Sequence, residues 1–317
     1  MVTLGEAMLR LSPPRGELLA DADLFQATVG GAESNVAVAL AALGGRVAWI
    51  GGLPDNALGA RVASELRACG VDTSRIVWRE EGRVGLYVVE AGVPPRPAAV
   101  LYDRAGSAAT TVAPADLEGR LDGATHAVVS GVTAALEPHG AALARRFLER
   151  AGELGARRYL DVNYRSRLWP VERARPVLRE LAAQAEVVVS SAADARTVLG
   201  LDAPDGELAA TLQREVAPQA ELAVVTHGDR GASAFSATQG AVAAAGHDVE
   251  VVDGLGAGDA LLAGLVWSDL EGRPPADALA AGVALAALAC TVRGDHARFA
   301  PADVERLLRQ DRAKAAR

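Results

Sequence analysis

Residues 253–259, Asp-Gly-Leu-Gly-Ala-Gly-Asp, combine the residue types that bind an anion. The preceding valine-rich run, residues 249–252, predicts a buried strand, and residues 260–266, apolar on every side, predict a buried helix. A glycine-rich turn between a strand and a helix points backbone N–H groups at one place, where the helix dipole favours an anion. Asp259 would stand beside that anion. Such a site suits the transfer of a negatively charged group to a substrate hydroxyl.

Competing interpretations of the same stretch make different demands on the sequence. Asp259 could be a plain helix cap, and the glycines could serve only a tight turn. A dinucleotide fingerprint would need glycine where Leu261 stands. A Walker-A loop would need a lysine, and the only lysine is Lys314. Any nucleotide phosphate must therefore be held by backbone amides and arginines.

Composition excludes several other functions. The chain has 317 residues, half of them apolar and 23% charged, with a net charge of −8. This charge argues against a nucleic-acid partner held through phosphates, and the apolar run 283–290 is too short to span a bilayer. The first residues form no secretory signal, and two cysteines, Cys69 and Cys290, indicate no disulfide framework. We expect a cytoplasmic protein with no membrane or nucleic-acid partner.

Short apolar runs alternate with helical patterns along most of the chain. The expected strands are residues 2–4, 47–51, 126–130, 158–162, 186–190 and 222–226, and the expected helices include 36–44, 58–69, 140–154, 171–185 and 277–291. This alternation predicts an α/β fold with a central, mostly parallel sheet flanked by helices. We expect residues 1–317 to form one domain.

A second, smaller sheet is expected to project from this body. Residues 76–104 alternate like a hairpin around a proline-rich turn at 94–97, and residues 10–28 show no clear period. Both segments are predicted to form a lid over a site. Ligands of parallel sheets bind beyond the carboxyl ends of the strands, where Asn163, Arg165, Ser191 and His227 are expected.

Residues 253–259 resemble the Asp-Thr-x-Gly-Ala-Gly-Asp signature of the ribokinase-like (PfkB) sugar kinases. Residues 30–35, Gly-Gly-Ala-Glu-Ser-Asn, resemble that family's N-terminal Gly-Gly motif, and the likeness extends over nearly the whole chain. The resemblance implies phosphorylation of a sugar hydroxyl by ATP, a sheet flanked by helices, and a β-lid that often forms dimers. We therefore expect a homo-oligomer assembled through the lid.

Further motifs resemble the branch of the family that phosphorylates 2-keto-3-deoxygluconate at its terminal hydroxyl. They are residues 30–35, 102–104, 130–133, 161–165 and 293–296. Kinases of fructose, ribose or 5-dehydro-2-deoxygluconate remain alternatives, and so does a sugar-acid sensor without catalytic activity. A sugar acid needs cations, and Arg104 and Arg165 match the fork geometry of a carboxylate.

The resemblance assigns a role to each motif residue. Asp259 would accept the proton of the attacking hydroxyl, and the amides of Gly256, Ala257 and Gly258 would hold the charge on the transferred group. The expected substrate contacts are Gly31, Ala32, Glu33, Ser34, Asn35, Tyr87, Tyr102, Arg104, Arg165 and Asp295. The expected ATP contacts are Asn163, Arg165, Ser191, Thr226, His227, Gly228, Asp229, Arg230, Gly231, Gly256 and Gly258.

Two positions depart from the family pattern. Gly254 replaces the usual threonine of the signature. The family's Asn-x-x-Glu, which organises Mg²⁺ and phosphate through water, is Ser191-Ala192-Ala193-Asp194 in this chain. Asp194 would reach the metal only through water, and Mg²⁺ would arrive with ATP.

Overall fold

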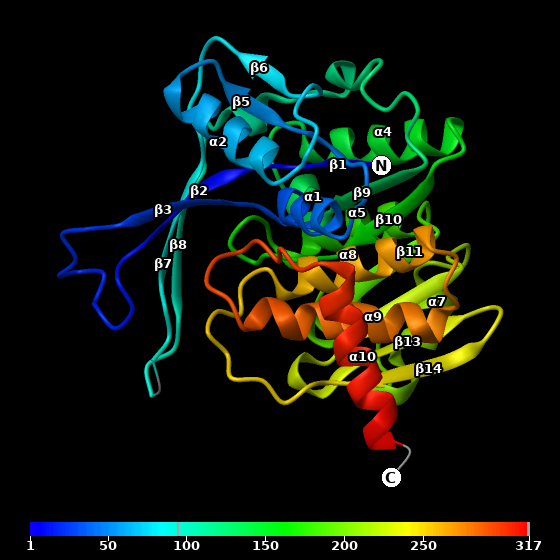
Figure 1. Cartoon of the computed structure of the whole chain (residues 1–317). Coiled ribbons are helices and arrows are strands. Elements are labelled where there is room, and N and C mark those ends of the chain that lie inside the picture. Colours follow the sequence, from blue (N-terminus) through cyan, green and yellow to red (C-terminus); the bar gives the residue numbers. More distant parts are fainter. Residues whose placement is uncertain (94, 316–317) are drawn as a thin grey trace.

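An eight-stranded sheet forms the body of the protein, as seen in a computed structural model that describes residues 1–93 and 95–315 (Figure 1). Pro94, in the expected proline-rich turn, lies outside the described residues. The strands in spatial order are β14 (Gly240–Ala245), β13 (Gly231–Ser236), β12 (Leu222–Thr226), β11 (Val187–Ser191), β10 (Arg157–Asp161), β9 (His126–Ser130), β1 (Val2–Leu4) and β4 (Ala48–Ile50).

Six of these strands, from β12 to β4, are parallel, which confirms the mostly parallel sheet expected from the alternating pattern. The last two strands, β13 and β14, pair antiparallel at one edge. They were not expected, because their glycine, serine and alanine residues carry little of the β-branched signal of a strand.

Helices cover both faces of the main sheet (Figure 1). They are α1 (Ala32–Ala42), α2 (Ala57–Ala68), α3 (Gly131–Ala134), α4 (Gly140–Glu153), α5 (Val171–Ala182), α6 (Ala192–Thr197), α7 (Leu208–Glu215), α8 (Ala257–Leu270), α9 (Pro275–Cys290) and α10 (Pro301–Ala315), with short 3₁₀ turns η1 (Ala108–Thr111), η2 (Pro114–Leu117), η3 (Asp205–Glu207) and η4 (Gly228–Arg230). In the described part of the chain, no helix combines the length and hydropathy that a membrane span requires.

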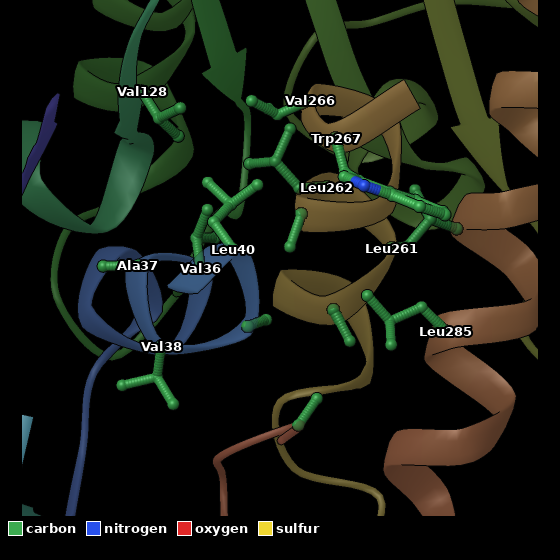
Figure 2. Close-up of a cluster of buried hydrophobic side chains, with 14 of the residues drawn as sticks. Val36, Ala37, Val38, Leu40, Val128, Leu261, Leu262, Val266, Trp267 and Leu285 are labelled. Atoms are coloured by element: carbon green, nitrogen blue, oxygen red, sulfur yellow. The ribbon is translucent and has the colours of Figure 1, made fainter. Parts of the chain in front are cut away.

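Each strand sends alternate side chains to opposite faces, so that the sheet separates two apolar cores. Val187 and Val189 of β11 join one core, whereas Val188 between them joins the other. Figure 2 shows the first core, in which Leu40 of α1, Leu262 of α8 and Leu285 of α9 meet. Because α8 is buried over most of its length, its N-terminus is held firmly at the carboxyl edge of the sheet.

A four-stranded sheet projects to one side of this body (Figure 1). Its order is β3 (Gln26–Gly30), β2 (Met8–Ser12), β7 (Leu86–Glu90) and β8 (Ala99–Asp103). The β7–β8 pair is the antiparallel hairpin expected from the alternating residues. Residues 5–7 alone separate β1 of the main sheet from β2 of this smaller sheet, which we call the lid.

Two expectations about strands were wrong. The start of the expected hairpin, β6 (Val77–Arg79), pairs instead with β5 (Gly52–Pro54) in a separate two-stranded sheet. Residues 249–252 form no strand, and Val251 is 55% exposed. The backbone N–H of Val252 bonds the carbonyl of Cys290 at the end of α9, so the end of this run is tied to a helix rather than to a strand.

Candidate active site

A cavity of about 560 Å³ lies between the lid and the carboxyl ends of the main-sheet strands. Residues far apart in the sequence meet around it because the ends of parallel strands share one edge. The expected residues in its wall are Gly31, Ala32, Asn35, Tyr87, Tyr102, Arg104, Arg165, Gly256, Asp259 and Asp295. The structure thus brings most of the expected substrate contacts around one space large enough for a sugar.

Asp259 lies in the first turn of α8 and is 9% exposed. Its Oδ2 accepts a hydrogen bond of 2.7 Å from Nδ2 of Asn35. The pKa of Asp259 is raised to about 7; burial is the largest cause, Asp295 and Glu33 contribute to the increase, and Asn35 and Arg165 oppose it. A carboxylate with a pKa near neutrality is well matched to accept a proton from a hydroxyl.

The glycine loop before α8 has the geometry of an anion site. Gly256 caps the helix with φ +83°, a conformation that favours glycine. A Cβ at this position would meet the carbonyl oxygen of Asp295 at 2.4 Å. The first N–H groups of a helix have no partner within the helix, so those at the start of α8 are free to face a phosphoryl group beside Asp259.

Arg104 lies in the cavity wall at the end of β8. Its Nε is 2.9 Å from Oε2 of Glu6, and its guanidinium stands over the ring of Tyr102 at 5.3 Å. Tyr102 stacks in turn on Tyr87 of the neighbouring strand. Glu6 is buried and also accepts a hydrogen bond from Ser107. Its ion pair with Arg104 therefore fixes the guanidinium in the cavity wall. Arg165 also belongs to the cavity wall and is exposed.

Asp295 is fixed from two directions. Its Oδ2 accepts a hydrogen bond of 2.7 Å from the hydroxyl of Tyr87, and its Oδ1 accepts one of 2.5 Å from Arg10. Arg10 belongs to β2 and is 2% exposed. Burial and the neighbouring Asp295 carboxylate raise the pKa of Tyr87, which keeps its hydroxyl a donor. One carboxylate at the cavity therefore takes its orientation from two lid strands.

Glu33 and Ser34 do not line the cavity, and the expectation that they contact substrate disagrees with their placement. Glu33 accepts hydrogen bonds from the N–H and hydroxyl of Ser130 and from the hydroxyl of Thr133. The hydroxyl of Ser34 bonds the carbonyl of Gly31. In the first turn of α1, Ala32 and Asn35 share the face toward the cavity, whereas positions 33 and 34 point into the protein.

A second cavity, of about 340 Å³, adjoins the other side of the glycine loop. Its wall includes the expected Thr226, Gly228, Asp229, Gly231 and Gly258, together with Gly254 and apolar residues of α8 and α9. The side chains of His227 and Arg230 have other partners: the ring of His227 bonds Ser233, and Arg230 pairs with Asp205. Residues 249 and 251, mistaken for part of a strand, line this cavity.

Two further carboxylates, Asp161 and Asp194, lie near Asp259. The pKa of Asp161 is raised to about 8, first by burial and then by repulsion from Asp259 and Asp194, with Arg165 opposing the increase. Asn163 turns the chain after Asp161 with φ 32°, and its N–H bonds the Asp161 carboxylate. Ser191 caps α6 by accepting a hydrogen bond from the N–H of Asp194. Mutual repulsion among these acids is what a nearby cation would relieve.

The described residues contain no group of three or more His, Cys, Asp or Glu side chains placed to hold a metal ion. Asp161 and Asp194, which repel one another, match the one or two carboxylates through which Mg²⁺ is usually bound while it keeps its other ligands from water and phosphate.

Three residues of this region were not anticipated: Glu6, Arg10 and Asp161. Asp161 belongs to the motif 161–165, in which only Asn163 and Arg165 were predicted to contact a ligand. Arg10 is the only charged residue of β2, Met-Leu-Arg-Leu-Ser, and a single charge in an apolar strand is a signal of a buried partner. Its carboxylate partners, Asp253 and Asp295, lie more than 240 positions away, so no local pattern identifies them.

Comparison with known proteins agrees with this geometry. Residues 1–302 match the model of the pfkB family of carbohydrate kinases. The chain is 40% identical to a 2-dehydro-3-deoxygalactonokinase of Haloferax volcanii over 98% of this chain and 96% of that one. It is 32% identical to a 2-dehydro-3-deoxygluconokinase of Thermoproteus tenax, over 98% and 94% of the two chains. The crystal structure of 2-dehydro-3-deoxygluconokinase from Thermotoga maritima superposes with a TM-score of 0.92 at 31% identity, covering 97% of both chains.

The fold, with its glycine loop and lidded cavity, defines an ATP-dependent sugar kinase of the ribokinase-like class. The chain belongs to the pfkB family of carbohydrate kinases. Its similarity to kinases of 2-dehydro-3-deoxy sugar acids supports a sugar acid as the kind of substrate.

Proposed function

We propose that the protein transfers the γ-phosphoryl group of ATP to the terminal hydroxyl of 2-keto-3-deoxygluconate, also called 2-dehydro-3-deoxygluconate. The observation that supports this assignment most is the pairing of a buried base, Asp259, with two arginines, Arg104 and Arg165, in one cavity. A neutral sugar would have no need of these cations, whereas the carboxylate of a sugar acid would pair with them.

Within this proposal each part of the site has a chemical task. Asp259 accepts the proton of the terminal hydroxyl as that oxygen attacks. The N–H groups of Gly256, Ala257 and Gly258 hold the negative charge that spreads over the transferred group. Asn35 and Arg165 favour the ionised form of Asp259. Tyr87, Tyr102 and Arg104 of the lid cover the sugar, exclude water and fix the carboxylate end.

The cavity beyond the glycine loop would take the nucleotide of ATP, and its apolar wall from α8 and α9 suits a flat base. Mg²⁺ would accompany ATP and supply charge neutralisation at the phosphates, with Asp161 and Asp194 approaching it through water. A cytoplasmic setting, where ATP is available, and a homo-oligomer formed through the exposed Leu101 and Tyr102 of the lid complete the proposal.

The galactonate-derived epimer is a second candidate substrate, favoured by the 40% identity to the Haloferax volcanii enzyme. Both epimers present the same carboxylate, keto group and terminal hydroxyl. They differ at one hydroxyl, and the cavity wall offers polar side chains on both sides of the sugar, from Asn35 and from Asp295.

A substrate panel with coupled detection of ADP tests the assignment. The panel contains both 2-keto-3-deoxy epimers, 5-dehydro-2-deoxygluconate, fructose and ribose, each with ATP and Mg²⁺. We expect the highest kcat/KM for a 2-keto-3-deoxy acid, and a higher value for fructose or ribose would overturn the sugar-acid assignment. If the acids bind but no substrate is turned over, the protein is a sensor.

Asp259→Asn tests the role of the base in the same assay. The change keeps the shape of the side chain but removes its ability to accept a proton, and we expect kcat to fall by ~10²–10⁴-fold. Calorimetric binding of the sugar acid should persist. Retained turnover would remove Asp259 as the base.

A further inference from the structure

Arg10 lies on a lid strand, yet its guanidinium reaches across to the loops of the body. Its Nη1 donates to Oδ1 of Asp295 and its Nη2 to Oδ2 of Asp253, each at 2.5 Å, and its Nε donates to Ser12 at 3.0 Å. The side chain is 3% exposed, so these contacts are made away from water. One planar fork thus joins two carboxylates from segments about 40 residues apart, a geometry that lysine does not offer.

The two carboxylates are themselves tied to the glycine loop. Asp253 accepts hydrogen bonds from the N–H of Leu255 within that loop and from the N–H of Gly294. The carbonyl oxygen of Asp295 leaves no room for a side chain on Gly256, the N-terminal cap of α8. Arg10 therefore contacts both Asp253, which bonds the glycine loop, and Asp295, which packs against Gly256. These two residues flank the backbone amides that lie next to Asp259.

A purely structural role would be the simplest alternative. Buried ion pairs lose hydration, and well-packed apolar residues often stabilise a fold as well as they do. Two features favour a role in the reaction. Arg10 bonds Asp295, which lines the sugar cavity, and the charge of Asp295 in turn raises the pKa of Asp259. A group needed only for packing would not have to face either carboxylate.

We propose that Arg10 is a positioning residue, which locks the glycine loop and Asp295 in one arrangement and fastens both to the lid. The proposal rests on the proposed function in taking Asp259 as the base and Asp295 as a sugar contact. Arg10 itself contacts neither the sugar acid nor ATP. It acts through Asp253 on the amides that receive the phosphoryl group, and through Asp295 on the sugar.

Arg10→Met and Arg10→Lys test the proposal. Methionine keeps much of the volume and removes the charge, whereas lysine keeps the charge but cannot serve both carboxylates as a fork. For Arg10→Met we expect kcat to fall at least ~10²-fold, since small displacements of reacting groups cost about that much. The KM for the sugar acid should rise, and the KM for ATP should stay within about three-fold. Arg10→Lys should recover less than a tenth of the lost kcat.

The pH profile separates positioning from stability. Asp259 is faced by Asp295, Glu33 and Asp161, which are acidic, and by Arg165 and Asn35. Without Arg10 the charge of Asp295 acts on Asp259 unopposed, so the acid limb of kcat/KM should move to higher pH. A change that only loosened the fold would leave that limb in place.

Arg158→Met is the matched control, because Arg158 forms a partly buried pair with Glu186 at the opposite end of the strands. It should lower the melting temperature and leave kcat and the pH profile unchanged. If Arg10→Met behaves like this control, or if both Arg10 variants keep kcat within about three-fold, the proposal is wrong. Should Arg10→Met fail to fold, Arg10→Lys decides by the same criteria.

The proposed function is judged separately, from the wild-type enzyme on the substrate panel. A wild type that prefers a neutral sugar overturns the sugar-acid assignment, and the Arg10 comparison is then made with that preferred sugar. A wild type that turns over the sugar acid while both Arg10 variants match it overturns the role of Arg10 alone.

Discussion

The side-chain amide of Asn35 donates a hydrogen bond of 2.7 Å to Oδ2 of Asp259, which joins the first turn of α1 to the first turn of α8. The orientation of this amide is set by its other end, where Oδ1 accepts a hydrogen bond from the N–H of Gly31. The helices α1 and α8 begin 225 positions apart in the sequence, yet both N-termini lie at the same cavity. The hydrogen bond between Asn35 and Asp259 joins them there.

Replacing Asn35 should change the pH dependence of the reaction. The hydrogen bond favours the ionised form of Asp259, whose pKa lies at about 7, and Asn35→Ala would raise that pKa further. Since the ionised carboxylate is the active base, the acid limb of kcat/KM should move to higher pH. We expect about a ten-fold loss at pH 6.5 and a smaller loss at pH 8.5.

Ser34→Ala is the control for this measurement, because the Ser34 hydroxyl bonds the carbonyl of Gly31 and points away from Asp259. It should leave the acid limb where it is in the wild type. An acid limb that is the same in Asn35→Ala would show that this hydrogen bond does not tune the base.

Asp161 should make the free protein less stable as the pH rises. Its pKa is raised from 3.8 in a model peptide to about 8, so the folded protein binds this proton more tightly than the unfolded chain. Stability from this group is complete below pH 4 and declines up to about pH 8. Asp161→Asn removes the decline, and we expect it to gain roughly 1–3 kcal/mol over wild type at pH 8 relative to pH 5.

Urea unfolding at the two pH values, without ATP or Mg²⁺, measures this difference. Asp72→Asn is a control of opposite sign, because a hydrogen bond from the N–H of Ser74 lowers the pKa of Asp72. Its removal should cost stability at neutral pH. Equal pH slopes for Asp161→Asn and wild type would contradict the shifted pKa.

Arg104 should discriminate between acidic and neutral substrates. Arg104→Met removes the guanidinium that Glu6 holds in the cavity wall, and charged hydrogen bonds of this kind are worth ~10–100-fold in binding. We expect the KM for the sugar acid to rise by that factor and the KM for ATP to change little. Arg83→Met, which removes an arginine that lies before β7 and pairs with the exposed Asp103, serves as control. Equal changes in both KM values would argue against carboxylate recognition by Arg104.

Gly256 should tolerate no side chain. With φ +83° and the carbonyl oxygen of Asp295 at 2.4 Å from an added Cβ, Gly256→Ala must displace either the loop or Asp295. We expect a lower melting temperature and a loss in kcat of ~10²-fold or more. Gly254→Ala adds the same methyl where no atom lies within 4 Å, and its melting temperature should match that of wild type. A Gly256→Ala enzyme with wild-type kcat would show that the loop geometry is not needed.

Local patterns were sufficient for the body of the fold. Runs such as Val187, Val188 and Val189 can be buried on both sides only between helices, and the structure shows this arrangement. The same logic was wrong for residues 249–252, because a valine-rich run indicates burial or a ligand cavity as readily as a strand. Which of these holds depends on whether a neighbouring strand offers hydrogen bonds.

Within the site, the motifs identified residues at the cavity but not the side chains behind them. Asn35 and Glu33 stand in one motif, yet only Asn35 faces the cavity, because the direction of a side chain depends on where the helix begins. Arg10 and Glu6 act through partners distant in the sequence. Such contacts arise from the packing of the lid on the body, which no local pattern contains.

The three residues between β1 and β2 have a consequence for protein engineering. Because the chain passes from the main sheet to the lid within residues 5–7, the lid is not a cassette that can be exchanged between relatives. A chimaera cut anywhere in this junction would separate Arg10 from Asp253, and a cut after Glu6 would also separate Glu6 from Arg104. Recombination that transfers residues 6–12 together with residues 99–104 and 253–295 would keep both pairs, so new specificities are more readily grafted as this discontinuous set than as a contiguous segment.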